Sequence, residues 1–361
     1  MHSDCSPGFA VGGRIFWWRV STWAACATLC VCPSLLAQSG GPEIRDLIRQ
    51  GQAALDNRQF PEAVSKFQRA QQLAPQSLEA NRGLLLSYLQ AGRLAEGEEL
   101  GREAIARWPQ DAELRHWLGL VRFKAGRSAE ALETLRQAQK LGRSGFGIHF
   151  DIALALLAQD QSAAAAEELE AALKFDSSDA IAHVLLGRAF QNTNRTVQAV
   201  AQFQTALRLD PNTLLGHYHL GFAYASLGRN QEAIAEYEKE IARAPNNPSV
   251  TYQLGHCLLE AGDWKASIAH LQKATELDPR SADAAYDLGK AKLLAGETEA
   301  AIVALQRAIE LKPTDPSPHY QLARALEKAG KNDEAKVERQ RFAELKKLQP
   351  QTGGMASGRN Q

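Results

Sequence analysis

A period of 34 residues runs through most of the chain and restricts its fold more than any other feature. Glycine marks this period at Gly187, Gly221, Gly255 and Gly289. A second series, twelve residues later, holds a small residue at every step: Ala63, Gly97, Ala131, Ala165, Ala199, Ala233, Ser267, Ala301 and Ala335. A period of this length indicates a stack of similar supersecondary units, each of which contacts only its neighbours.

The period fits nine consecutive repeats without an insertion. The predicted boundaries are 44–77, 78–111, 112–145, 146–179, 180–213, 214–247, 248–281, 282–315 and 316–349. Each repeat divides into two amphipathic helices joined by a short turn. In the seventh repeat Leu254 and Leu258 show helical spacing, and Gly262 supplies the turn. Neither helix can bury its apolar face alone, so we expect neighbouring repeats to pack together.

Two repeats depart from the common pattern. The second holds Gly83, Leu85, Gly97 and Gly101 at positions where packing residues are expected. Each glycine inside a helix costs about 1 kcal/mol relative to alanine, so we expect a looser repeat. The second helix of the ninth repeat carries Arg339 at an inward position and is rich in charge, which predicts a polar capping helix. Residues 350–361 are small and polar, and we predict a disordered tail.

The first 37 residues have the pattern of an export signal. Arg14 and Arg19 precede an uncharged stretch, residues 20–37, which ends at a small residue, Ala37. We therefore predict a signal peptide over 1–37, cleaved or retained as a membrane anchor, and a linker over 38–43. Cys26 approaches a lipoprotein signal, but Trp23 is unfavourable at its first position. The expected location is periplasmic or secreted, with membrane contact only if the segment stays uncleaved.

Charge and cysteine content restrict the partners and the chemistry. Lys plus Arg and Asp plus Glu both number 41, so no net positive charge attracts nucleic acid, and we expect no nucleic-acid partner. After residue 32 the chain holds one cysteine, Cys257, which we interpret as a core thiol. A mature chain with a single cysteine suits an oxidising compartment.

Histidine recurs at the repeat spacing, at His149, His183 and His217. Metal ligands must lie about 2.1 Å from one ion, whereas equivalent residues of stacked helices are separated by about 8–10 Å. We therefore interpret these histidines as packing residues. The sequence also lacks a phosphate-binding loop, a His-Glu-x-x-His motif and a Gly-x-Ser-x-Gly motif. We predict no catalytic residue, no metal, no cofactor and no enzymatic activity.

The spacing of the repeat residues resembles that of the tetratricopeptide repeat. The motif is carried by Leu220, Gly221, Tyr224, Ala233, Tyr237 and Pro245, and again by Leu186, Gly187, Phe190, Ala199, Phe203, Ala206 and Pro211. The resemblance implies an all-α, right-handed superhelical solenoid of helix–turn–helix units, whose first helices line a concave groove. In place of the family's first motif residue, Trp, this chain has His149, His183, His217 and His319.

The fifth and ninth positions of each first helix are four residues apart and so share one face. Along the repeats they give an apolar part and then a basic, aromatic part. The candidate groove residues are Leu86, Leu120, Phe123, Phe150 and Leu154, followed by Arg188, Tyr218, Phe222, Tyr252, His256, Tyr286, Lys290, Tyr320 and Arg324. Aromatic residues and arginine often anchor interfaces, although tyrosine at this position is also common in the family.

From these residues we expect a non-enzymatic scaffold in a bacterial envelope that binds an extended peptide or a partner helix. The alternative is a regulatory or substrate-recruiting subunit of an envelope enzyme or assembly complex. Family members that clamp a terminal carboxylate use an asparagine that no ninth position here supplies. The sequence therefore disfavours that mode of binding.

Overall fold

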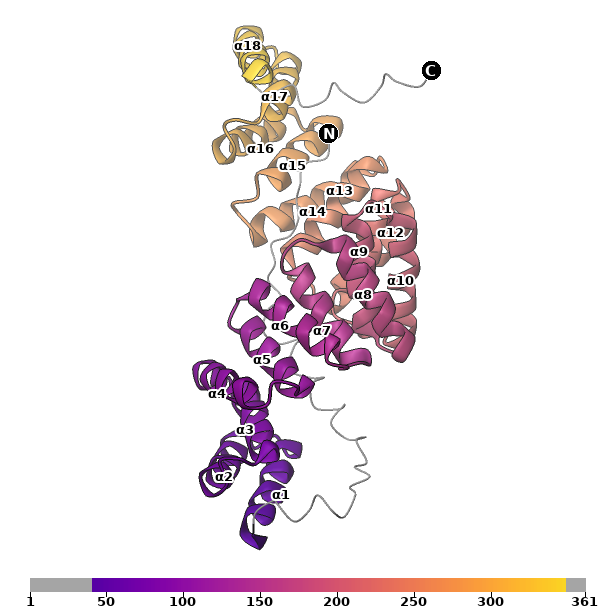
Figure 1. The fold of residues 1–361 in the computed structure, drawn as a ribbon. Helices are drawn as coiled ribbons and strands as arrows, with labels where there is room; N and C mark the ends of the chain where they lie inside the picture. Colours follow the sequence, from indigo (N-terminus) through magenta and orange to yellow (C-terminus); the bar gives the residue numbers. More distant parts are fainter. Residues whose placement is uncertain (1–40, 349–361) are drawn as a thin grey trace, which may run out of the picture. The chain divides into compact units, whose positions relative to one another are not determined.

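A computed structural model describes residues 41–348, which form eighteen α-helices and no strand. The chain divides into two compact units, residues 1–193 and 194–361. In both units the helices follow one another as antiparallel pairs (Figure 1). The predicted signal segment and the predicted tail lie outside the described residues. Between residues 41 and 348, no helix is both long enough and apolar enough to cross a bilayer.

The N-terminal unit contains the first nine helices. They are α1 (Pro42–Asp56), α2 (Phe60–Leu73), α3 (Leu78–Ala91), α4 (Leu94–Arg107), α5 (Ala112–Lys124), α6 (Ser128–Lys140), α7 (Phe146–Leu157), α8 (Ser162–Phe175) and α9 (Ala180–Asn192). Helix α1 begins inside the segment predicted as a linker, because Pro42 is favourable in the first turn of a helix.

The C-terminal unit contains the other nine. They are α10 (Thr196–Leu209), α11 (Gly216–Ser226), α12 (Asn230–Arg243), α13 (Pro248–Glu260), α14 (Trp264–Leu277), α15 (Ala282–Leu294), α16 (Thr298–Leu311), α17 (Pro316–Lys328) and α18 (Asn332–Leu348). The predicted fold class, an all-α series of tandem helix–turn–helix repeats, is confirmed.

Local residues explain where the helices begin and where the chain turns. Six odd-numbered helices have a side chain that accepts a hydrogen bond from a backbone N–H of the first turn: Ser77, Asp111, Asp179, Asn247, Ser281 and Asp315. Between the two helices of a repeat, Gly262 and Gly296 adopt positive φ, of 86° and 87°. Only glycine adopts this conformation readily, so it ends the first helix of these repeats.

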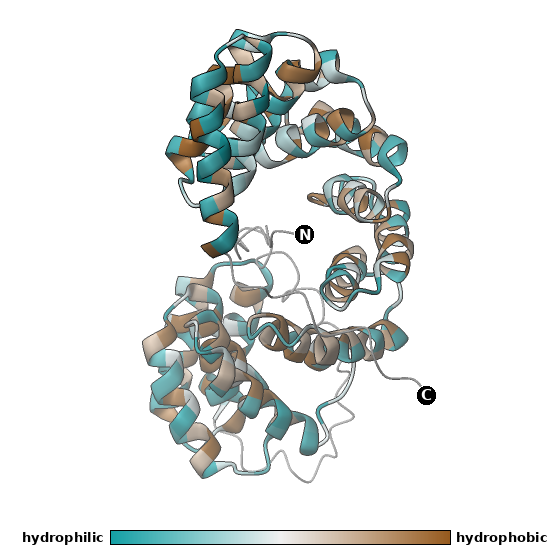
Figure 2. Cartoon of the chain, turned by 90° about the horizontal axis from the view of Figure 1, so that it is seen from above, coloured by the Kyte–Doolittle hydropathy of each residue, from teal (hydrophilic) through white to brown (hydrophobic). Residues whose placement is uncertain are grey.

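The small residues lie where helices approach most closely. Ala131, Ala199 and Ala301 have no exposed surface. A Cβ atom added at Gly255 would lie 2.8 Å from Cγ of Leu271, which leaves no room for a side chain. Figure 2 shows that hydrophobic and hydrophilic residues alternate along the helices throughout the described chain. The repeat period therefore records the contacts that hold neighbouring helices together.

The glycines of the second repeat face its neighbours. A Cβ atom at Gly101 would lie 2.7 Å from Leu118, and one at Gly97 would lie 3.2 Å from Val121. Both glycines are buried on α4 and bring this helix close to α5. These two glycines lower the helix propensity of α4, but they also allow α4 to pack closely against α5 of the third repeat.

Helix α18 differs from the other second helices in its surface. Among its residues only Ala335 is buried. The expectation that Arg339 lies at an inward position is wrong, because its side chain is 58 % exposed and pairs with Glu327 of α17 at 2.5 Å. The last described helix therefore presents a mainly polar surface to solvent, together with the exposed side chains of Val337 and Leu348.

Candidate functional site

Within each unit the first helices of successive repeats contact one another. Helices α1, α3, α5 and α7 do so in the N-terminal unit, and α11, α13, α15 and α17 in the C-terminal unit. Their fifth and ninth residues therefore form rows. We call Leu86, Phe150 and Leu154, together with Phe123 (the twelfth residue of its repeat) and Arg188 (on α9), the N-terminal strip. The C-terminal strip consists of Phe222, Tyr252, His256, Tyr286, Lys290, Tyr320 and Arg324.

Two residues predicted for the groove are buried. Leu120 is 3 % exposed and belongs to the hydrophobic core of the N-terminal unit. Tyr218 is 7 % exposed, and its ring centroid lies 6.1 Å from that of Tyr237. The prediction that these two side chains are open to a partner is wrong, because both fill space between packed helices.

The N-terminal strip is mainly apolar. Leu86, Phe123, Phe150 and Leu154 are partly exposed. The Phe150 ring stacks on Phe146 at 5.2 Å, which holds it in place. Trp117, which the sequence interpretation omitted, is also partly buried and packs against the same core as Leu86. Adjacent apolar side chains that remain half-exposed are typical of a surface that a partner covers.

Polar contacts join the first helices of the N-terminal unit. His116 Nε2 lies 2.7 Å from Asp151 Oδ2, and Arg143 Nε donates to His116 Nδ1 at 3.2 Å. A guanidinium can only donate, so Nδ1 must accept and the ring proton must lie on Nε2, toward Asp151. Arg82 pairs with Asp111 and lies 3.0 Å from Glu113. These contacts connect α3 to α5 and α5 to α7.

Ion pairs neutralise two of the basic residues in the C-terminal strip. His256 Nδ1 lies 2.8 Å from Asp287 Oδ2, and Lys290 Nζ lies 2.8 Å from Glu260 Oε1. The hydrogen bond to Asp287 raises the pKa of His256, and the hydrogen bond from Lys290 lowers the pKa of Glu260. Both pairs connect α13 to α15. The sequence interpretation missed the acids, although Asp287 follows His256 by three residues less than one repeat.

The far part of the C-terminal strip combines a hydrogen-bonded arginine with aromatic rings. Arg324 donates to Oε1 of Gln321 at 3.1 Å. Burial raises the pKa of Tyr286, so the Tyr286 hydroxyl keeps its proton. Tyr320 is 47 % exposed, its ring lies 5.3 Å from Phe342, and the Arg324 guanidinium lies 6.0 Å from its centroid. Among the described residues no carboxylate pairs with Arg324.

The remaining basic member of the strips, Arg188, is partly buried on α9, and burial lowers its pKa. Phe222 is partly exposed on α11, with its ring 6.5 Å from that of Tyr218. Because Tyr218 is buried, Phe222 is the more exposed of these two rings of α11. Both side chains keep the exposure that a contact with a partner requires.

Three of the four histidines at the first motif position contact glutamates of the same repeat, and the fourth, His183, lies 3.1 Å from the backbone oxygen of Ser177. Nδ1 lies 2.6 Å from a glutamate oxygen in His149–Glu168, His217–Glu236 and His319–Glu338. Each contact joins the first helix of a repeat to the second, which is a packing role. Between residues 41 and 348, no group of three or more acidic, histidine or cysteine side chains is placed to hold a metal ion.

Cys257 is 1 % exposed on α13. Burial raises the pKa of its thiol to about 12. A thiol with this pKa is protonated at neutral pH and is a poor nucleophile. The interpretation of Cys257 as a core thiol is confirmed.

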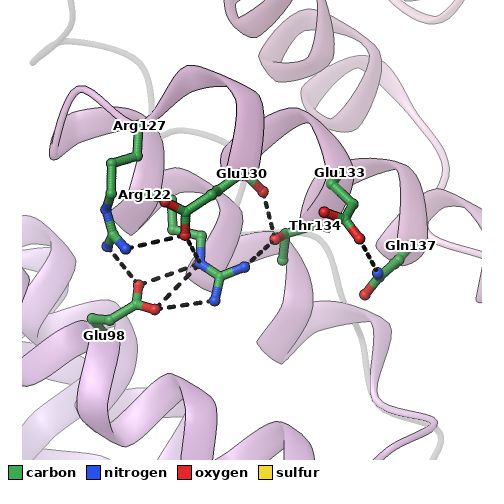
Figure 3. Close-up of polar contacts among 7 residues, drawn as sticks. All are labelled: Glu98, Arg122, Arg127, Glu130, Glu133, Thr134 and Gln137. Carbon is green, nitrogen blue, oxygen red and sulfur yellow. Dashed lines mark hydrogen bonds and ion pairs between the residues drawn. The ribbon is translucent and has the colours of Figure 1, made fainter.

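A second polar cluster connects the second and third repeats (Figure 3). Glu98 of α4 accepts from Arg122 at 3.0 Å and from Arg127 at 2.8 Å, while Arg122 also donates to Thr134 of α6 at 2.6 Å. Burial tends to raise the pKa of Glu98, but the bonds from both arginines outweigh it and lower the pKa.

A surface hollow of about 960 Å³ lies beside this cluster. It is lined by the outer face of α4 and by the turn before α6. Its residues are Leu94, Ala95, Glu98, Glu99, Arg102, Glu103, Ala106, Ala125 and Arg127. None of them is a groove residue predicted from the sequence, and its charges are of both signs. The two strips therefore remain the stronger candidates for a binding surface.

Comparison with family models identifies one type of repeat along nearly all of the described chain. A tetratricopeptide-repeat model matches residues 48–112, 102–146, 118–180, 150–213, 184–248 and 252–316. A second tetratricopeptide-repeat model matches residues 292–341. A comparison with curated proteins finds no match.

Several solved structures are similar. The Cut9–Hcn1 hetero-tetramer of the APC/C is 15 % identical, with a TM-score of 0.51 over 78 % of this chain and 55 % of that one. MamA is 26 % identical, with a TM-score of 0.43 over 45 % of this chain and 95 % of that one. YrrB, described as a TPR protein with an unusual peptide-binding site, is 22 % identical, with a TM-score of 0.46 over 52 % and 95 %.

Proposed function

Because the chain belongs to the tetratricopeptide-repeat family, we propose that it is a non-enzymatic scaffold that binds another protein along its first helices. Proteins of this family generally serve as protein-interaction scaffolds. The observation that carries the proposal is the presence, in each unit, of aromatic or apolar side chains that stay partly exposed on adjacent first helices. Such side chains supply most of the binding energy in protein interfaces.

The N-terminal strip supports binding of an apolar segment. Phe150 and Leu154 lie one helical turn apart on α7, and Leu86 lies on α3 of the same unit. The polar groups beside them, His116 and Asp151, already bond each other. A partner that covers this strip gains mainly from burial of apolar area, at about 25 cal/mol per Å².

We also propose that the protein acts outside the cytoplasm, in the envelope of a bacterium. The positive residues Arg14 and Arg19, the uncharged stretch 20–37 and Ala37 support this location. Mass spectrometry of the protein isolated from its cell gives the test. A first residue at Gln38 would support cleavage, an intact N-terminus in the membrane fraction would support an anchor, and a cytoplasmic intact chain would contradict export.

Site-directed photo-crosslinking in intact cells tests the scaffold proposal. A crosslinking residue replaces Phe150 in the strip, and a matched control replaces Phe175, which is 57 % exposed on the second helix α8. We expect a discrete adduct from position 150 and none from position 175. Equal labelling at both positions, or none at position 150, would contradict a partner site on the first helices.

The identity of the captured partner distinguishes the two forms of this function. A set of different partners supports a general scaffold. One enzyme in constant stoichiometry supports a regulatory or substrate-recruiting subunit of an envelope complex. Catalytic turnover by the purified chain, with no protein bound, would contradict both.

A further inference from the structure

We propose that the C-terminal strip binds a proline-rich segment in the polyproline II conformation, with one turn of the ligand for each repeat. The ligand contacts Tyr252, Tyr286 and Tyr320 in succession. This inference rests on the scaffold function proposed above and specifies the partner of one of its two strips.

The spacing of the tyrosines agrees with the period of such a ligand. Tyr252, Tyr286 and Tyr320 occupy the same position of α13, α15 and α17, and these helices contact one another in order. Equivalent residues of packed helices are about 8–10 Å apart. A polyproline II helix has three residues per turn and rises about 3.1 Å per residue, which gives about 9 Å per turn. Each tyrosine therefore meets the same face of the ligand.

The hydrogen-bonding groups of the strip suit a ligand that only accepts. A proline-rich segment offers backbone carbonyls and almost no N–H groups. On the protein, the carboxylates Asp287 and Glu260 are already bonded by His256 and Lys290. At the end of the strip, the Tyr320 hydroxyl and the Arg324 guanidinium can donate to such a ligand.

The Arg324 end of the strip provides a donor for such a ligand. One guanidinium N–H of Arg324 donates to Oε1 of Gln321 at 3.1 Å. A guanidinium has five N–H donors and no acceptor. Its other N–H groups can therefore donate to a carbonyl of the bound segment.

Contacts within the strip hold the rings in position before a ligand arrives. The Tyr320 ring lies 5.3 Å from that of Phe342, and the Arg324 guanidinium lies 6.0 Å from its centroid. The ring of Tyr252 lies 6.0 Å from that of His256, which Asp287 fixes. A preordered surface loses less side-chain entropy on binding, and a polyproline II ligand is itself stiff.

Two other ligand classes fit less well. An amphipathic partner helix needs a continuous apolar surface, which the N-terminal strip has. The C-terminal strip lacks one, because each tyrosine is followed four residues later by a basic side chain, His256, Lys290 or Arg324. An acidic segment would have to compete for Lys290 with Glu260 and for His256 with Asp287, both held at 2.8 Å. Aromatic-lined surfaces are the usual recognition sites of proline-rich segments.

The test titrates the full chain with synthetic peptides of three, six and nine prolines and measures affinity by calorimetry. Two nine-residue controls are a glutamate-rich extended peptide and a leucine–lysine amphipathic helix. We expect affinity to rise with each added turn up to nine residues. We expect little dependence on salt, because the ligand carries no side-chain charge.

Variants locate the binding. Tyr320→Ala removes an exposed ring and should weaken nonaproline binding about two- to tenfold. Trp264→Ala removes a ring of similar exposure, 40 %, from the second helix α14 and should leave binding unchanged. Circular dichroism of both variants checks that the helices are intact. Tyr286→Phe removes the hydroxyl but keeps the ring, and should weaken binding by a smaller factor.

Three outcomes would overturn the proposal. The first is binding of nonaproline that Tyr320→Ala does not change. The second is tighter binding of the acidic or helical control at Tyr320, in which case the scaffold function stands with another ligand class. The third is absence of binding by every peptide; if photo-crosslinking from positions 150 and 320 also captures no partner, the scaffold function fails as well.

Discussion

The two units present different surfaces on helices of the same repeat. At the fifth and ninth positions the N-terminal unit offers Phe150 and Leu154, whereas the C-terminal unit offers Tyr286 and Lys290. The buried small residues are the same in both units: Ala131 and Ala301 are each fully enclosed. The packing of the helices and the binding surface therefore depend on different positions of the repeat. The residues of the binding surface can vary while the buried small residues stay the same.

The largest expected effect tests the shared framework. Ala131→Leu in the N-terminal unit and Ala199→Leu in the C-terminal unit should each lower the free energy of unfolding by about 1–3 kcal/mol, because neither site has room for a larger side chain. Thermal melting followed by circular dichroism measures the loss. Ala201→Leu, at an exposed site of α10, is the control. A loss of stability in only one of these two variants would contradict the conclusion that both units share the same packing framework.

The second prediction concerns the ionic cluster of the N-terminal unit. Glu98→Gln should lower the free energy of unfolding at pH 7 by about 1–3 kcal/mol, since Arg122 loses its charged acceptor. The pKa of Glu98 is lowered in the folded chain, so its contribution is present above the unfolded pKa and disappears as pH falls through the folded one. The variant should therefore lose less stability on acidification between pH 5 and 3 than the parent.

Glu133 provides the control for this cluster, because it is exposed and bonds only Gln137, at 3.4 Å. Denaturant unfolding of Glu133→Gln should match the parent at both pH values. An equal effect of the two substitutions would mean that the cluster contributes no specific stability.

The third prediction is a gain in stability, and it concerns a buried residue of the C-terminal unit. Glu240 is 4 % exposed, and its Oε2 atom has no hydrogen-bond partner. The equivalent residue of the seventh repeat is Ala274, which packs without a polar group. Glu240→Ala should raise the free energy of unfolding by about 1 kcal/mol, because a buried carboxylate oxygen is removed. A lower melting temperature would show that Glu240 has a partner that stabilises the unit.

The smallest expected effect concerns the ion pair of the C-terminal strip. The pKa of His256 is raised in the folded chain, so its contribution is present below the unfolded pKa, about 6.5, and is lost as pH rises through the folded one. Since the His256 side chain is 40 % exposed, we expect less than about 1 kcal/mol. His256→Gln should flatten the decline in stability above pH 6.5, whereas His270→Gln should leave that decline in place.

The fold could be predicted because its signal is repeated. One buried alanine would be uninformative, but Ala131, Ala165 and Ala199 at one spacing identify a packing position. The same reasoning placed Cys257 in the core. These residues depend on the backbone of the repeat, which is common to all its copies.

The binding surface could be predicted only in part, because it depends on what lies beside each residue. At the ninth position Leu154 is partly exposed while Leu120 is buried, and at the fifth position Tyr320 is exposed while Tyr218 is buried. The charge of Lys290 is visible in the sequence, but its neutralisation by Glu260 requires the geometry of two helices. The position of a residue in the repeat therefore predicts the helix face on which its side chain lies. The neighbouring side chains determine whether that side chain is exposed to a partner.

The polar surface of α18 has a consequence for assembly. A further repeat could extend the stack only by covering Lys336 and Arg339, whose charges already pair with Asp333 and Glu327 in contact with water. Removing these charges from water costs free energy, against which α18 offers only the exposed apolar side chains Val337 and Leu348. A surface of this kind disfavours end-to-end association of copies of the chain at α18.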